Sequence, residues 1–408
     1  MRLRYFHGRS WTVAVVLVAV VGCGTTPALP PASIVSSPAP TASTLVDATI
    51  GSTPDSVSVT LLPRTMPGSD RSDTTRTDPP TSADWIDVTG NLVGIDSECG
   101  NVSIVASSPS SATEVAVIAL HGAFSMDDGS GEWVPLGAGA SSAKITNRGM
   151  TIVFDPTHSD TFWEVGSYNG GGIYRTDDAG QTFQQLGTLT HIDGLAIDFE
   201  DPLRQTMIAV THESSTIYRS ADGGVTWADI SKDLPASVGY LSGPVLIGPN
   251  EYLVGSRMDT DSGIFVTTNG GATWRNVYQG GVSGYPVVPA DDGIMYWAQY
   301  NGGMIASTDG GANWTAIADA TVTSAVPINV VALADGRIAT VGSKNGILAS
   351  SDRGHTWSYV SSKLPFSANG LSYSATENAF YAWRFDCNAP GKNVITEQSI
   401  VRFDLDGN

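Results

Sequence analysis

From residue 85 onward, the chain alternates short runs of β-type residues with compact polar turns. The run Gly263-Ile264-Phe265-Val266, for example, precedes a polar turn, and Trp274-Arg275-Asn276-Val277 follows it. Runs of this length that are rich in β-branched and aromatic residues, and bounded by Gly, Asp and Thr, are typical of antiparallel strands in hairpins. The pattern therefore predicts an all-β fold.

The polar turns repeat along the chain. Five eight-residue segments share the pattern Ser/Thr-x-Asp/Asn-x-Gly-x-Thr/Asn-aromatic, and their terminal aromatic residues recur every 40 to 47 residues. That period suits a four-stranded propeller blade. The Asp or Asn supplies a short acceptor for turn amides, and the Gly tolerates a positive φ. We call these segments turn motifs; they are residues 176–183, 220–227, 267–274, 307–314 and 350–357, and a looser sixth, residues 125–133, has one extra residue.

The turn motif resembles the Asp-box, or BNR, repeat of sialidases, sortilin-type receptors, xyloglucanases and photosystem II assembly-factor propellers. The resemblance covers about residues 85–405, nearly all of the folded chain. It implies a single β-propeller in which the motifs are structural turns between strands 3 and 4 of each blade. A ligand site is then expected on the opposite face, which consists of the connections from strand 4 to the next strand 1 and from strand 2 to strand 3.

The two ends of the repeat region predict how the ring closes. Trp85-Ile86-Asp87-Val88 matches the strand that follows a turn motif, and Ile400-Val401-Arg402-Phe403 matches the strand that precedes one. Pairing of these segments in the last blade removes the open sheet edge between the first and last blades. Six motif-bearing blades and this composite blade give a seven-bladed propeller, with six or eight blades as the alternatives.

The first 22 residues have the organisation of an export signal. Three arginines precede the apolar run Trp11–Val21, which is too short for a permanent membrane span. Gly22 and Cys23 follow the run, and the segment Val20-Val21-Gly22-Cys23 resembles the lipobox of bacterial lipoproteins. We therefore expect residues 1–22 to be a signal peptide and Cys23 to carry a lipid. The protein would then be anchored on the outer face of the bacterial cytoplasmic membrane.

Residues 23–83 are predicted to form a tether. The segment is dense in Pro, Ser, Thr and Ala and has no aromatic residue before Trp85. Such a composition buries too little apolar surface to offset the entropy lost on ordering. A coil of about 60 residues has a root-mean-square span of about 40 Å. The propeller is predicted to occupy residues 84–408.

Charge and cysteine content limit the expected partners. The formal net charge is −19, and the 21 Lys and Arg residues form no cluster, so nucleic acid is not an expected partner. Cys99 and Cys387 are the cysteines other than Cys23, and in an exported protein they predict a disulfide. No ligand spacing predicts a metal site and no complete motif predicts a cofactor. We expect a monomer.

Polar and aromatic residues are expected to converge on the face opposite the turn motifs. Aromatic rings, imidazoles, carboxylates and a few cations over a central channel suit a polar ligand or a sugar. The densest group is His191, Asp193, His212 and Glu213, which are expected to come from consecutive blades. The candidate ligand-binding residues are Arg148, Tyr168, His191, His212, Tyr240, Arg257, Asp259, Tyr300, Lys344, Trp383 and Arg384, and Tyr285 and Asn329 are expected on the same face.

Two functions are compatible with these residues. A glycoside hydrolase needs two carboxylates about 5–9 Å apart, and Asp193 with Glu213 is the one pair to consider as catalytic. Sialidase activity is not expected, because no Arg-Ile-Pro motif is present. The turns at Asp155-Pro156 and Asp201-Pro202 are similar to xyloglucanase hairpins, but those enzymes cleave between two propellers and this chain has one. The main prediction is therefore a binding or assembly role toward an extracellular protein, peptide or glycan, and a hydrolase acting on extracellular glycans is the alternative.

Overall fold

A computed structural model describes residues 77–81, 84–137, 145–169, 171–257, 261–289, 293–324, 328–384 and 393–406. All of them belong to one compact unit, Arg71–Asn408. Cys23, Cys387 and Asp259 lie outside the described residues, as does the side chain of Cys99, so the lipid anchor and the disulfide stay predictions. No helix in the described ranges has the length and hydrophobicity to span a bilayer.

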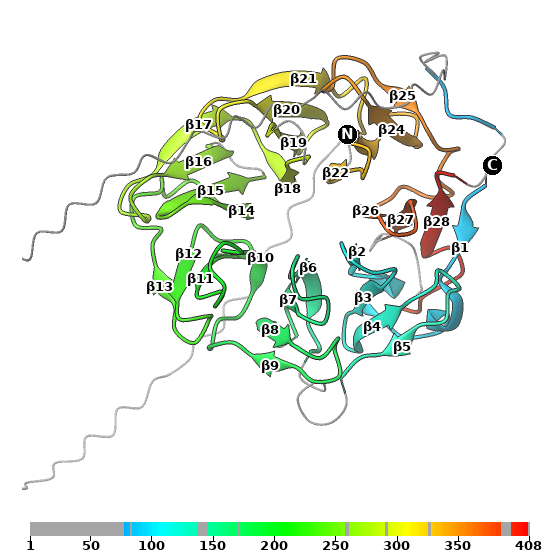
Figure 1. Cartoon of the computed structure of the whole chain (residues 1–408), viewed down its shortest axis with the longest axis horizontal. Helices are drawn as coiled ribbons and strands as arrows, with labels where there is room; N and C mark the ends of the chain where they lie inside the picture. Colours follow the sequence, from blue (N-terminus) through cyan, green and yellow to red (C-terminus); the bar gives the residue numbers. More distant parts are fainter. Residues whose placement is uncertain are drawn as a thin grey trace, which may run out of the picture. The chain divides into compact units, whose positions relative to one another are not determined.

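The strands form seven antiparallel sheets of four strands each, arranged as blades around a common centre (Figure 1). The predicted all-β, seven-bladed propeller is confirmed. Blade 1 consists of β2 (Ile104–Ser107), β3 (Glu114–Ile118), β4 (Gly122–Met126) and β5 (Val134–Pro135). Blade 2 consists of β6 (Arg148–Phe154), β7 (Phe162–Ser167), β8 (Ile173–Thr176) and β9 (Gln184–Gln185). Blade 3 consists of β10 (Ile192–Ile197), β11 (Thr206–Thr211), β12 (Ile217–Ala221) and β13 (Ala228–Asp229).

Blades 4 to 6 repeat this order. Blade 4 consists of β14 (Leu241–Gly248), β15 (Glu251–Ser256), β16 (Gly263–Thr267) and β17 (Arg275–Gln279). Blade 5 consists of β18 (Val282–Val287), β19 (Met295–Gln299), β20 (Gly303–Ser307) and β21 (Thr315–Asp319). Blade 6 consists of β22 (Val331–Ala332), β23 (Ile338–Val341), β24 (Ile347–Ser350) and β25 (Ser358–Tyr359). In every blade the first strand faces the centre and the fourth lies at the rim (Figure 1).

The seventh blade contains strands from both ends of the described chain. β26 (Gly370–Ser374), β27 (Ala379–Trp383) and β28 (Ile400–Asp404) are its first three strands, and β1 (Ile86–Asp87) is the fourth. Ile86 pairs with Arg402 and Asp87 with Val401, antiparallel. The 3-10 turns Gly90–Leu92 and Glu98–Gly100 then lead the chain to β2.

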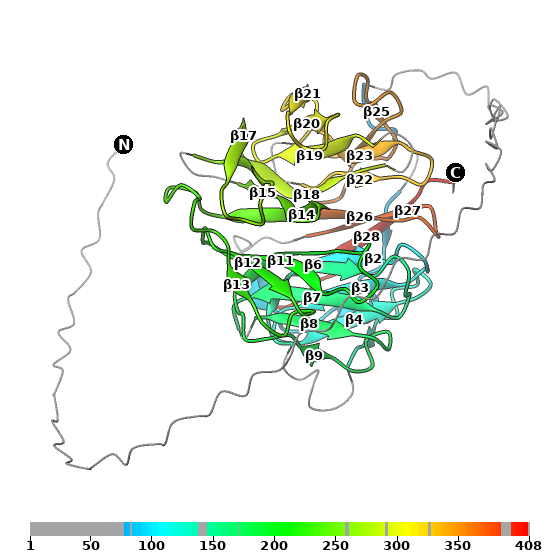
Figure 2. The same cartoon turned by 60° about the vertical axis from the view of Figure 1, so that its left-hand side comes forward.

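The strands are apolar where neighbouring blades cover them and polar at the rim. All five residues of β3 and of β27 are buried, whereas both residues of the outer strands β5, β9 and β13 are exposed. Figure 2 shows the outer strands β9 and β13 at the periphery of their blades. The buried clusters lie between blades, as where Val115 and Val117 of blade 1 pack with Phe162 and Tyr174 of blade 2. The core is therefore a series of seams, and each blade needs its neighbours.

Each turn motif is closed by its own side chains. In residues 220–227, Ser220 Oγ accepts a hydrogen bond from Gly224 N at 2.8 Å and donates one to Asp222 Oδ1 at 2.8 Å. The Asp222 carboxylate also accepts bonds from Thr226 N at 2.9 Å and Thr226 Oγ1 at 2.6 Å. The hydrogen bonds from Thr226 hold the pKa of Asp222 below its usual range. The turn itself thus uses this carboxylate.

The glycine at the fifth position of the turn motif lies against the preceding blade. Gly271 has a φ of +91°, and a Cβ placed on it would lie 2.5 Å from the Cβ of Ile230, which follows β13. The same approach is made by Gly180 to Leu136, by Gly224 to Leu186 and by Gly354 to Ile317. Glycine is required both for the backbone conformation and because no side chain fits. In blade 1 the looser motif also contacts the blade before it, since Trp133 Nε1 donates to Val88 O at 2.9 Å.

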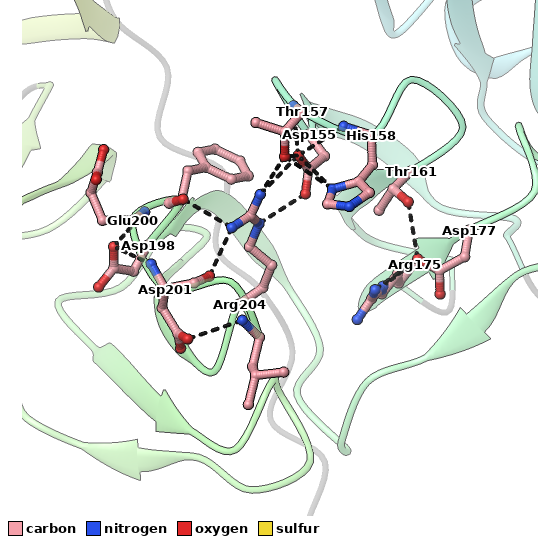
Figure 3. A network of polar contacts seen from close by, with 12 residues as sticks. Asp155, Thr157, His158, Thr161, Arg175, Asp177, Asp198, Glu200, Asp201 and Arg204 are labelled. Carbon is pink, nitrogen blue, oxygen red and sulfur yellow. Dashed lines mark hydrogen bonds and ion pairs between the residues drawn. The ribbon is translucent and has the colours of Figure 1, made fainter.

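A buried ion pair joins blades 2 and 3 at their connections between strands 1 and 2 (Figure 3). Arg204 Nε and Nη2 donate to the two oxygens of Asp155 at 2.8 and 3.0 Å, and Nη1 donates to the carbonyl oxygens of Phe199 and Asp201. Burial alone would raise the pKa of Asp155, but the hydrogen bonds from Arg204 and Thr157 outweigh it and hold that pKa well below its usual range. This Asp-Pro turn therefore serves the contact between two blades.

Two glutamates are buried between blades. Glu164 of β7 accepts a hydrogen bond from Asn147 Nδ2 at 3.1 Å, and Glu114 of β3 accepts one from Ser107 Oγ at 2.7 Å. Burial raises the pKa of each carboxyl to about 8, so both are mainly neutral in the folded protein at neutral pH. Among the described residues, Asn147 Oδ1 and Glu164 Oε1 find no hydrogen-bond partner.

The contact of the fifth-position glycine with the preceding blade predicts that two glycine-to-alanine substitutions differ in their effect on stability. Gly271→Ala should lower the free energy of unfolding by about 2–4 kcal/mol, because the methyl group meets Ile230 at a positive φ. Gly310→Ala, also at positive φ but with no atom within 4 Å of the new Cβ, should lower it by only about 1 kcal/mol. Urea denaturation of the two variants measures the difference, and equal losses would show that the blade contact contributes nothing.

The raised pKa values predict that stability falls as the pH rises from about 4.5 to about 8. In this window the folded protein retains protons that the unfolded chain has released, so each buried glutamate contributes a slope of about −1.4 kcal/mol per pH unit. Glu164→Gln, which imitates the neutral acid, should therefore raise the urea midpoint at pH 8 and change it little at pH 4.5.

The control for this measurement is Glu132→Gln, because Glu132 is exposed in the looser motif of blade 1. It should leave the midpoint unchanged at both pH values. A Glu164→Gln protein that gains no stability over the wild type between pH 4.5 and pH 8 would contradict the raised pKa.

Candidate functional site

A cluster of polar side chains forms where blades 2, 3 and 4 adjoin, on the face opposite the turn motifs. Tyr168 follows β7, Asp193 is the second residue of β10, His212 and Glu213 follow β11, and Arg257 follows β15. Strand 2 ends and strand 1 begins at the same edge of an antiparallel sheet, so these residues share one edge in each blade. The structure brings together Tyr168, His191, Asp193, His212, Glu213 and Arg257, and we call this group the His212 cluster.

One chain of hydrogen bonds runs through the His212 cluster. His212 Nδ1 lies 2.6 Å from Asp193 Oδ1, and His212 Nε2 lies 2.8 Å from Tyr168 Oη. The Tyr168 hydroxyl also lies within donating distance of Glu213 Oε1, at 3.1 Å. At the other end, Arg257 Nη2 donates to Asp193 Oδ2 at 3.0 Å. Side chains from three blades thus form a single network.

The network is buried at one end and exposed at the other. The side chain of Asp193 is 1% exposed and that of His212 is 9% exposed, whereas that of Glu213 is 53% exposed. Thr151 Oγ1 of blade 2 donates to the backbone carbonyl of Asp193 at 2.8 Å. Both carboxylate oxygens of Asp193 are therefore used inside the protein, and it is a positioning residue that presents no oxygen to a ligand.

The rings of the cluster pack edge to face. The Tyr168 ring lies 4.9 Å from the rings of both His191 and His212, at interplanar angles of 82° and 78°. The two imidazoles are nearly parallel, with centroids 6.0 Å apart. His191 is exposed. The surface of the cluster therefore consists of the His191 ring, part of Tyr168 and the Glu213 carboxylate.

Five non-glycine residues at this edge of blades 2 to 4 have left-handed backbone conformations. The φ values are +57° at Tyr168, +45° at Asn169, +57° at His191, +51° at Glu213 and +46° at Tyr240. Non-glycine residues in this region cost of order 1 kcal/mol or more each, and they persist where surrounding contacts hold them. Their place beside the hydrogen-bonded network supports this edge as the candidate site.

The surroundings of Tyr168 and Arg148 shift the pKa values of both side chains. Burial and the hydrogen bond to Glu213 both raise the pKa of Tyr168, so the hydroxyl acts as a donor and not as a nucleophile. Burial lowers the pKa of Arg148, while Glu98, Tyr168 and Asp193 act in the opposite direction. The predicted Arg148 therefore adjoins the cluster from blade 2.

Tyr285, which was expected at the ligand face, lies half-buried in β18, the inner strand of blade 5. Its hydroxyl accepts a hydrogen bond from Leu195 N at 2.7 Å and donates to Leu195 O at 3.2 Å. The contact links blade 5 to blade 3 across the inner strand of blade 4, and burial raises the pKa of Tyr285. Tyr285 therefore fixes the strand that carries Asp193.

Other predicted residues lie at the same edge but in blades 6 and 7, apart from the His212 cluster. Trp383 is 6% exposed, and its ring packs on Gly370. Arg384 Nη2 donates to Thr396 Oγ1 at 2.5 Å within its own blade. Lys344 Nζ forms an ion pair with Asp78 at 2.5 Å, which attaches the segment 77–81 to blade 6.

The remaining predicted residues have simpler environments. Tyr240 and Tyr300 are half-buried, and Asn329 Nδ2 donates to Leu371 O of blade 7 at 2.6 Å. Sequence reasoning missed Thr151 and Glu98, which approach Asp193 and Arg148. Glu98 lies in a connection that leads into the first strand of a blade, so the strand-counting rule could have predicted it at this face. Nothing in the sequence of β6 distinguishes Thr151. In the described ranges no group of three His, Cys, Asp or Glu residues is arranged to hold a metal ion.

No protein-family model and no curated protein matches the chain. The GH74 enzyme of Niastella koreensis has a similar structure over 78% of this chain and 44% of its own, at 18% identity and a TM-score of 0.52. The chain thus spans less than half of that enzyme.

Two further structures share the fold. YCF48 bound to a D1 peptide matches over 80% of this chain and 97% of its own, at 15% identity and a TM-score of 0.52. PorZ, a bacterial surface component of the type-IX secretion system of Porphyromonas gingivalis, matches over 75% and 46%, at 12% identity and a TM-score of 0.51. At these identities the similarity shows the propeller fold alone.

The burial gradient in the network predicts unequal effects of two isosteric substitutions. Asp193→Asn should lower the free energy of unfolding by about 2–4 kcal/mol, because it leaves Arg257 without its buried counter-charge. Glu213→Gln, at the exposed end, should change it by less than about 0.5 kcal/mol. Urea denaturation measures both, and a stable Asp193→Asn protein would mean that the buried charge pair is not needed for folding.

Proposed function

We propose that this chain is a binding protein of the bacterial cell envelope, and that its propeller holds an extracellular protein, peptide or glycan at the His212 cluster. The observation that supports binding over hydrolysis is the state of Asp193. Its two oxygens are engaged by His212 and Arg257, and its side chain is 1% exposed. A glycosidase needs two carboxylates that reach the substrate, and here Glu213 alone is exposed.

The exposed end of the cluster has the groups that polar recognition uses. His191 and Tyr168 offer ring surface and hydrogen-bonding atoms, and Glu213 offers a carboxylate. The buried network beneath them restricts their movement, so little side-chain entropy is lost on binding. The strained backbone at Tyr168, His191 and Glu213 is consistent with a preorganised site.

The sequence of the N-terminal region supports the location. We propose that residues 1–22 direct export, that Cys23 is lipidated, and that residues 23–83 tether a monomeric propeller of the Asp-box type on the outer face of the cytoplasmic membrane. A binding role agrees by analogy with the solved structures of YCF48 bound to a D1 peptide and of PorZ, a surface component. The GH74 enzyme of Niastella koreensis is the analogy for the alternative, a glycoside hydrolase.

Site-directed capture tests the binding role. A glycan array and an envelope extract from the source bacterium are probed with the wild-type chain and with His191→Ala, Tyr168→Ala and Glu132→Gln. We expect affinity for the captured ligand to fall at least about tenfold in the first two variants, which corresponds to about 1.4 kcal/mol. The control on the opposite face, Glu132→Gln, should bind as the wild type does.

Two results would contradict this proposal. Capture that is equal in all variants would place the binding surface elsewhere. Turnover of a glycoside panel that disappears in both Asp193→Asn and Glu213→Gln, with the latter still folded, would establish the hydrolase in its place.

A further inference from the structure

The Tyr168 hydroxyl has one proton and two neighbours that can accept it. His212 Nε2 lies at 2.8 Å and Glu213 Oε1 at 3.1 Å. A ring nitrogen that already carries a hydrogen cannot accept another hydrogen bond. The direction of the Tyr168 hydroxyl therefore depends on whether His212 Nε2 is protonated.

The buried end of the network determines where the first proton of His212 lies. Asp193 Oδ1 is 2.6 Å from Nδ1, and Oδ2 is held by Arg257. A buried carboxylate oxygen needs a donor, so Nδ1 carries a hydrogen. A second proton must then enter at Nε2, the nitrogen that faces Tyr168 and, at 3.5 Å, Glu213.

Two hydrogen-bond arrangements follow. When His212 is neutral, Nε2 and the Glu213 carboxylate compete for the single hydroxyl proton of Tyr168. When His212 is protonated, Nε2–H donates to Tyr168 Oη, and the hydroxyl proton turns to Glu213. The added proton remains on His212. The change that reaches the surface is the new direction of the Tyr168 hydroxyl, which points to Glu213.

The charges around His212 come from each element that packs against it. Asp193 of β10 and the adjacent Glu213 favour a second proton on the ring. Arg257, which follows β15, opposes it, as does His191 when that ring is itself protonated. Arg148 at the start of β6 lies within electrostatic range of Asp193, Tyr168 and Arg257.

We infer that His212 is a proton-dependent gate for Glu213, and that Glu213 contacts an ammonium or guanidinium group of a basic ligand. Protonated His212 turns the Tyr168 hydroxyl to Glu213 and places a positive charge 3.5 Å from Oε1, and both effects oppose a bound cation. Neutral His212 lacks that charge and competes with Glu213 for the Tyr168 proton. The inference rests on the proposed binding function of the same surface. The net charge of −19 also favours a basic partner. Because imidazoles change charge between about pH 5 and 8, acidification across this range should weaken binding.

The gate is tested without a ligand by NMR titration of the histidine rings in the full chain. In the wild-type background, Glu213→Gln should lower the titration midpoint of His212 by about 0.5 pH unit or more, because the outer acceptor loses its charge. In a Tyr168→Phe background, the same substitution should have a much smaller effect. His355, in a turn motif, is the internal control for folding and pH and should titrate identically in all variants.

Equal midpoint changes in the two backgrounds would overturn the gate, because they would show direct attraction between His212 and Glu213 without the hydroxyl. No change in either background would overturn it as well. These outcomes do not depend on any ligand, so they leave the proposed binding function standing.

The ligand class is tested with two blocked pentapeptides, Gly-Lys-Gly-Arg-Gly and Gly-Glu-Gly-Asp-Gly. The basic peptide does not titrate between pH 5 and 8, so a change in its affinity reports the protein. We expect it to bind about tenfold more weakly at pH 5 than at pH 8 at constant salt, and to lose this pH dependence in His212→Gln. Stronger binding of the acidic peptide, or unchanged pH dependence in His212→Gln, would overturn the assignment.

A coupled histidine titration without binding of either peptide would overturn the basic-ligand assignment alone. In that case the capture of a glycan lost in His191→Ala would still support the proposed function. Loss of all capture and of peptide binding together would refute the binding function itself.

Discussion

The close approach of each turn motif to the blade before it is the constraint on which the propeller depends. At Gly180, Gly224, Gly271 and Gly354 the backbone has a positive φ and a Cβ would lie 3.0 Å or less from an apolar side chain of the preceding blade, most severely at Gly271, where the atom met is the Cβ of Ile230. Glycine alone satisfies both conditions. Because the motif carboxylate closes the same turn, as Asp222 does, the residues that identify the repeat hold blades together and are not free for chemistry.

This packing fixes the inner strands relative to one another, and the inner strands in turn position the His212 cluster. Tyr285 of blade 5 holds the backbone of Leu195 in blade 3, and Thr151 of blade 2 holds the carbonyl of Asp193. A buried carboxylate between Arg257 and His212 is stable only when all partners keep their geometry. The rigidity of the ring therefore permits a charged network beneath an exposed surface, which a loop region without such support would not maintain.

Fold and function separate clearly in this protein. Solved structures of similar fold include an enzyme and a protein bound to a peptide, so the propeller alone does not decide between them. The decision rests on the site. The two carboxylates that a hydrolase would use occupy unlike environments, since Asp193 is enclosed by Arg257 and His212 and Glu213 is open to solvent. That asymmetry suits a binding site in which Glu213 accepts hydrogen bonds at the surface and Asp193 fixes the side chains below it.

The sequence by itself determined the strands and the turn motifs, because period and turn chemistry are local properties that repeat, and it favoured seven blades over six or eight. Strand counting also placed His191, Asp193, His212 and Glu213 at one edge, since antiparallel strands alternate direction. It placed Lys344, Trp383 and Arg384 at that edge too, but it did not predict which partners their side chains contact. Only the tertiary structure showed that Trp383 packs on Gly370, that Lys344 pairs with Asp78, and that Tyr285 reaches another blade. Side-chain direction and the meeting of non-adjacent blades depend on how the whole ring packs, and no local pattern in the chain encodes that.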